Sequence, residues 1–138
     1  MVVALLTTLY HLSQTVNGQG KQKVFTSDIE VELIKKKDIY FKYTETLDEH
    51  PLDVVMRVGT HDIRLSRRGI IQMNFHFVPH VFTDTFYESP AGRHHFRLYT
   101  RKLSNDIARI EIIYDLYEGE TCIGNYEYIL ESSETNGS

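Results

Sequence analysis

The alternation of apolar and polar residues along most of the chain is the feature that most constrains its fold. Residues 24–34, 39–46 and 108–117 each place apolar side chains at most of their alternate positions. Successive side chains of a β-strand point to opposite faces of a sheet, so this period predicts strands with one buried face. We find no convincing amphipathic-helix period in the chain, and an all-β fold is therefore expected.

Turn-forming sequences interrupt the alternation at short intervals. They include Asn17-Gly18, the lysine run at 35–37, residues 59–62, Ser89-Pro90-Ala91-Gly92 and residues 118–120. About ten short strands with such spacing are typical of an antiparallel meander, folded as a sandwich or closed into a barrel. We predict a single up-and-down β-barrel of about 8–10 strands over residues 1–131, followed by a polar, disordered tail at 132–138.

Length and composition restrict the setting of the protein. The chain has 138 residues, which suits one domain with a real core, and a single cysteine, Cys122, so no internal disulfide can form. The first 14 residues lack the basic start and cleavage site of a signal peptide and are too short to cross a bilayer. We expect a cytoplasmic protein without a membrane segment.

Charge is distributed unevenly along the chain. The net charge is −4, but residues 57–102 carry a net +5 and residues 103–138 a net −7. A basic middle segment is what an anionic partner needs, whereas basic and acidic strands side by side neutralise each other across a sheet. We favour the second interpretation, because nucleic-acid-binding domains usually carry an overall basic excess.

Several segments together suggest a family. The run from Val58 to Phe77, with Arg68-Gly69 followed by Met73, and the later Tyr87…Pro90…Gly92 turn carry the likeness. They resemble the YwiB-like proteins, small uncharacterised bacterial proteins placed among the lipocalin-like, or calycin, β-barrels. The resemblance covers nearly the whole chain and implies a closed antiparallel barrel in a bacterial cytoplasmic protein. It brings no assigned catalytic residue and no cofactor.

Two predicted strands supply a candidate binding site inside the barrel. The inward set is predicted to be Met73, Phe75 and Phe77 on one strand and His94, Phe96, Leu98 and Thr100 on another. These side chains suit a small apolar or amphipathic ligand, and equally describe a packed core, which we favour. The leading hypothesis is a non-enzymatic binding module for such a ligand or for a protein partner.

The pair Arg67-Arg68 raises the question of which arginine faces the interior. Alternation allows only one of them to do so, and the answer depends on whether Gly69 belongs to the strand or to a bulge. We predict a hairpin tip with Gly69 in an unusual backbone conformation, and an inward or rim position for Arg68. A buried arginine needs a carboxylate or backbone carbonyls as partners.

Three other functions are weighed against this hypothesis. Arg93, Arg97 and Arg101, interleaved with Tyr99, could form a nucleic-acid or anion platform, but pairing with Glu111 or Asp115 on the next strand would neutralise it. His94 is the candidate for haem or metal binding, although no carboxylate or cysteine is spaced to complete a site. No nucleophile motif or phosphate-binding loop is present, so we expect no enzymatic activity.

Overall fold

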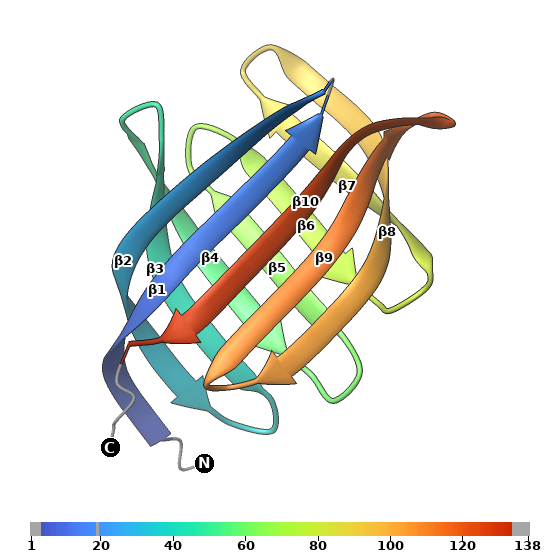
Figure 1. Cartoon of the computed structure of the whole chain (residues 1–138). Helices are drawn as coiled ribbons and strands as arrows, with labels where there is room; N and C mark the ends of the chain where they lie inside the picture. The colour runs from blue at the N-terminus through green and yellow to red at the C-terminus, as the bar shows by residue number, and fades with distance from the viewer. Residues whose placement is uncertain (1–3, 19, 134–138) are drawn as a thin grey trace.

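The computed structural model describes residues 4–18 and 20–133, and over these residues the chain forms a closed barrel of ten antiparallel strands (Figure 1). The predicted up-and-down barrel is therefore confirmed. The strands are β1 (Ala4–Gly18), β2 (Lys21–Lys35), β3 (Ile39–Leu47), β4 (His50–Val58), β5 (Ile63–Arg68), β6 (Gln72–Phe77), β7 (Phe82–Ser89), β8 (Gly92–Asp106), β9 (Arg109–Glu118) and β10 (Thr121–Ser132).

Each strand pairs with the one that follows it, and β1 pairs with β10 to close the ring. In Figure 1 the β1–β2 hairpin and β10 cross the front of the barrel, with β3 to β6 behind them. Ser133, which follows β10, still donates a backbone hydrogen bond to Leu9. The rest of the expected tail, residues 134–138, lies outside the described part. No helix that could cross a membrane occurs among the described residues.

The interior holds one continuous hydrophobic core built from alternate residues of the strands. In β9, for example, Ile110, Ile112 and Tyr114 point inward. Aromatic side chains meet at the centre, where the rings of Phe77 and Tyr114 lie 4.9 Å apart. Burying such aliphatic and aromatic side chains is the main favourable contribution to folding.

Gly69 corrects one prediction. Its backbone does not have positive φ, unlike Gly20, Gly92 and Gly119. Glycine is required at this position because a Cβ atom would lie 2.6 Å from the carbonyl oxygen of Pro51 and 2.7 Å from a methyl group of Leu52. Close approach to the start of β4, rather than backbone conformation, therefore excludes larger residues from the β5–β6 turn.

In two places around the barrel, the hydrogen-bonded ladder between adjacent strands is much shorter than the strands themselves. β2 and β3 pair only between residues 32–35 and 39–42, and β6 and β7 only between residues 72–74 and 86–88. Beyond its short ladder, the β6–β7 seam is closed by side chains. The hydroxyl of Thr85 donates to the carbonyl of Asn74, and that of Thr83 donates to the carbonyl of His76 at 2.6 Å.

No such closure occurs at the β2–β3 seam among the described residues. From Lys21 to Val31, β2 pairs with β1 alone, and from Tyr43 to Leu47, β3 pairs with β4 alone. Beyond the paired residues, the two strands diverge and leave an opening in the barrel wall. This opening positions the candidate site.

Candidate functional site

The predicted interior ligand site is filled by its own side chains. Phe75, Phe77, Leu98 and Thr100 are buried, and Met73 packs against the core. These side chains occupy the space in which we expected a small apolar ligand, which supports the packed-core alternative. The Thr100 hydroxyl is buried without a hydrogen-bond partner among the described residues.

The other two predicted residues lie away from this core. His94 is exposed, and its ring stacks on that of the partly buried Phe96 with centroids 6.4 Å apart. An exposed histidine of this kind does not provide the enclosed interior ligand that the haem hypothesis requires. No group of three or more metal-ligating side chains occurs within residues 4–18 and 20–133.

The inward arginine is Arg67, and the prediction for Arg68 is wrong. Arg67 is only 6% exposed, whereas Arg68 points to solvent. The signal was present in the sequence, because Arg67 continues the inward alternation of Ile63 and Leu65. The partner has the expected chemistry: Arg67 donates to both carboxylate oxygens of Glu45, at 2.7 and 3.5 Å.

Two tyrosines complete a buried polar cluster around this ion pair. Tyr128 donates to Glu45 at 2.6 Å, and the hydroxyls of Tyr43 and Tyr128 lie 2.5 Å apart. Because the proton of Tyr128 is directed to Glu45, Tyr43 is the donor to Tyr128. The Arg67 guanidinium also lies 5.6 Å from the ring centres of Phe75 and Tyr128. The cluster ties β3 to β5 and β10 through the interior.

Burial and charge shift the pKa values of the cluster in a consistent direction. Burial raises the pKa of the Tyr43 hydroxyl, and the neighbouring Glu45 carboxylate raises it further. Burial likewise raises the pKa of Tyr128 well above its ordinary value, with Tyr43 as the next cause. Burial alone would lower the pKa of Arg67, but Glu45, Tyr128 and Tyr114 together outweigh it and the pKa rises. The cluster thus contains one fixed ion pair and neutral tyrosines.

The opening between β2 and β3 is a groove of about 910 Å³. This volume is in the range of ligand-binding clefts. The groove borders the buried cluster, because Tyr43 belongs to both. The lining residues are Thr7, Ile29, Glu30, Glu32, Lys42, Tyr43, Thr44, Asp53, Val54 and Val55.

The charged side chains of the groove form no ion pair with any other described residue. Glu30, Glu32, Asp53 and Lys42 take part in none of the ion pairs formed within the described residues. Three carboxylates and one ammonium group give the groove an excess of negative charge. Sequence reasoning missed this site, since residues from β1, β2, β3 and β4 meet there only through the fold.

The basic face predicted on β8 has the opposite character. Arg101 donates to the buried carboxylate of Asp115 at 2.6 Å, which confirms the expected cross-strand pairing. The guanidinium of Arg97 covers the ring of Phe82 at 4.2 Å, and that of Arg93 covers the ring of Phe86 at 4.0 Å. Each arginine is therefore engaged within the protein, an arrangement that does not favour a phosphate platform.

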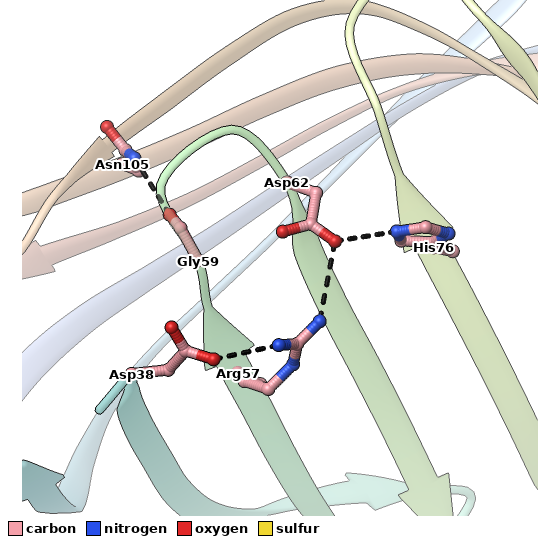
Figure 2. A network of polar contacts seen from close by, with 6 residues as sticks. All are labelled: Asp38, Arg57, Gly59, Asp62, His76 and Asn105. Carbon is pink, nitrogen blue, oxygen red and sulfur yellow. Dashed lines mark hydrogen bonds and ion pairs between the residues drawn. The ribbon is translucent and has the colours of Figure 1, made fainter. Parts of the chain in front are cut away.

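A second polar network, on the outer surface, includes a histidine but is structural. Arg57 joins Asp38 at 2.8 Å and Asp62 at 3.4 Å, and His76 joins Asp62 at 2.7 Å (Figure 2). Asn105 donates to the carbonyl of Gly59 in the adjoining turn. These contacts tie the β2–β3 and β4–β5 turns to β6 and β8 and fix the end of the barrel away from the open part of the seam.

The fold and the site together define a class: a small up-and-down β-barrel with a filled interior and a groove in its wall. The model of a family described as a domain of unknown function, DUF1934, matches residues 11–130. The chain belongs to this family, as the YwiB-like resemblance predicted.

One relative and one solved structure agree with this assignment. The chain is 24% identical over 115 residues to the uncharacterized β-barrel protein YwiB of Bacillus subtilis strain 168, covering 80% of this chain and 81% of that protein. The fold matches the crystal structure of the ywiB protein from Bacillus subtilis with a TM-score of 0.81 at 22% identity, over 94% of this chain and 93% of the other.

Proposed function

We propose that this barrel is a non-enzymatic binding module that holds an extended segment of a partner protein along the open edge of β2. The observation that carries the proposal is the one-sided pairing of β2 from Lys21 to Val31. In an antiparallel pair, alternate residues direct their N–H and C=O groups to the neighbour on either side. Every second residue of this stretch therefore offers backbone groups to an added strand, the mode of recognition called β-augmentation.

Exposed apolar side chains on the same stretch support the proposal. Val24 and Phe25 are each 56% exposed, although a strand interior usually buries one of two consecutive positions. Long open edges with apolar side chains promote unwanted pairing, and proteins usually cover or shorten them. An edge of this length next to a groove is explained if a partner occupies it.

The filled interior separates this proposal from the small-ligand alternative. Met73, Phe75 and Leu98 pack in or against one core cluster, whereas the groove lies in the barrel wall. A ligand that enters the interior would have to displace packed side chains, and cavities in close-packed cores are costly to create.

Site-specific photo-crosslinking in cells of the host organism tests the proposal. A photoreactive residue replaces Val24 on the open edge, and the matched control replaces Phe86, an exposed apolar residue on the outer face of β7. We expect the Val24 position alone to crosslink a defined segment of another protein, identified by mass spectrometry of the linked peptides. Crosslinks of equal yield from both positions, or none from Val24, would overturn the proposal.

A further inference from the structure

We infer that the bound segment alternates basic and apolar residues, with the basic side chains on the outer side of the barrel wall. This inference rests on the proposed function and adds the chemistry of the partner. It follows from which face of the wall each lining residue of the groove occupies.

The inner side of the groove is apolar. Ile29 shares the face of β2 that buries Val31 and Leu33, and it packs against the core. Tyr43 and Val54 are buried and also line the groove. Alternate side chains of an added strand would point toward this wall and gain from apolar contact with it.

The outer side of the groove is acidic. Glu30 alternates with Ile29 on β2, and Asp53 alternates with Val54 on β4, so both carboxylates lie on the outer face. Glu32 lies on the same face but has Lys42 as its cross-strand neighbour in the ladder. Asp53 has the exposed Arg68 as its neighbour, yet no ion pair joins them. Glu30 and Asp53 are the carboxylates most available to a guest.

An added strand completes the charge balance of this face. Its outward side chains would lie beside Glu30 and face Asp53 across the end of β3, where lysine or arginine is favoured and a carboxylate is repelled. Its inward side chains would meet Ile29, Tyr43 and Val54, where a charge would lose hydration without compensation. A segment with lysine or arginine at every second position and valine or isoleucine between them satisfies both sides.

Synthetic peptides provide a direct test. The probe is a fluorescent peptide in which lysine alternates with valine and isoleucine. Its controls replace every lysine by glutamate or by serine, or group the lysines at one end. We expect the alternating basic peptide to bind to the intact protein and to shift the amide resonances of β2 between Lys21 and Val31. The affinity of this peptide should decrease as the salt concentration rises. Equal binding of the glutamate peptide would overturn the inference.

Variants of the carboxylates identify the site. The double variant E30Q/D53N should weaken binding of the lysine peptide about fivefold to tenfold at low salt, as expected for two exposed ion pairs. The matched control D84N/E88Q neutralises two exposed carboxylates on β7 and should bind as the unaltered protein does. Unchanged affinity in E30Q/D53N would overturn the inference.

The serine peptide separates the two proposals. If it binds the β2 edge as tightly as the lysine peptide, strand addition stands and the basic alternation is wrong. If no peptide binds and Val24 forms no crosslink, both the alternation and the proposed function are wrong.

Discussion

The two short seams of the barrel, β6–β7 and β2–β3, differ in how the chain compensates for missing ladder hydrogen bonds. At β6–β7, the hydroxyls of Thr83 and Thr85 bond to the carbonyls that the neighbouring strand leaves free. At β2–β3, no such bridge forms within the part of the chain that the structure describes, and β3 is instead held from inside by Tyr43 and Glu45. The threonine hydrogen bonds close the wall at β6–β7. The interior contacts of Tyr43 and Glu45 keep β3 in place while the wall beside it stays open. The opening therefore lies beside a strand whose position the interior polar cluster fixes.

The largest expected effect comes from removing the interior anchor of β3. In Arg67→Met, Glu45 stays buried with Tyr128 as its remaining side-chain donor. Breaking a buried ion pair from one side costs about 3–5 kcal/mol of unfolding free energy. Urea denaturation measures the loss, and the neighbouring exposed Arg68→Met is the matched control, with an expected change within about 0.5 kcal/mol. Equal losses in both variants would contradict the anchoring role.

Alkaline pH should also lower the free energy of unfolding through the tyrosines that anchor β3 beside the open seam. The pKa values of Tyr43 and Tyr128 are raised in the folded protein, so their contribution is complete below the ordinary tyrosine pKa of about 10. Above about pH 10, the unfolded chain loses tyrosine protons that the folded protein retains. The free energy of unfolding then falls by about 1.4 kcal/mol per pH unit for each tyrosine. Urea midpoints at increasing pH measure this slope. Tyr43→Phe should give a shallower decline, and an unchanged slope would contradict the assignment.

A smaller effect is expected at the closed seam. Thr85→Val keeps the shape of a buried side chain but removes the donor to the carbonyl of Asn74. Leaving a buried acceptor unpaired costs about 1–3 kcal/mol. The control is Thr44→Val, an exposed threonine on the open part of β3. Thermal or urea unfolding compares the two, and a loss in Thr44→Val as large as in Thr85→Val would show that the hydroxyl does not close the seam.

Strand alternation was sufficient to predict the barrel, because it depends on residue type at fixed spacing. The same alternation pointed to Arg67, in phase with Ile63 and Leu65, and to Glu45, in phase with Phe41 and Tyr43. A possible bulge at Gly69, together with the family resemblance at Arg68-Gly69, favours Arg68 instead, and that choice is wrong. The longer alternation is the more reliable signal here, because it extends over the whole strand.

The groove could not be predicted from the sequence. It depends on where the β2–β3 ladder stops, and that point follows from the twist and register of all ten described strands. Nothing in the residues around Val31 and Tyr43 marks the end of pairing. The β2–β3 ladder ends at the pair of Glu32 and Lys42, and the geometry of the closed ring determines where it ends.

The pairing of β1 with β10 has a consequence for synthesis of the protein. Because Leu12 pairs with Leu130, the ring cannot close until the last strand has left the ribosome. Until then, a nascent chain would display the edges of β1 and β9 in addition to that of β2. Such distant pairings slow folding and lengthen the time in which edges can join other chains. In the finished barrel β10 covers both β1 and β9, and among the described strands the long edge that remains is the one beside the groove.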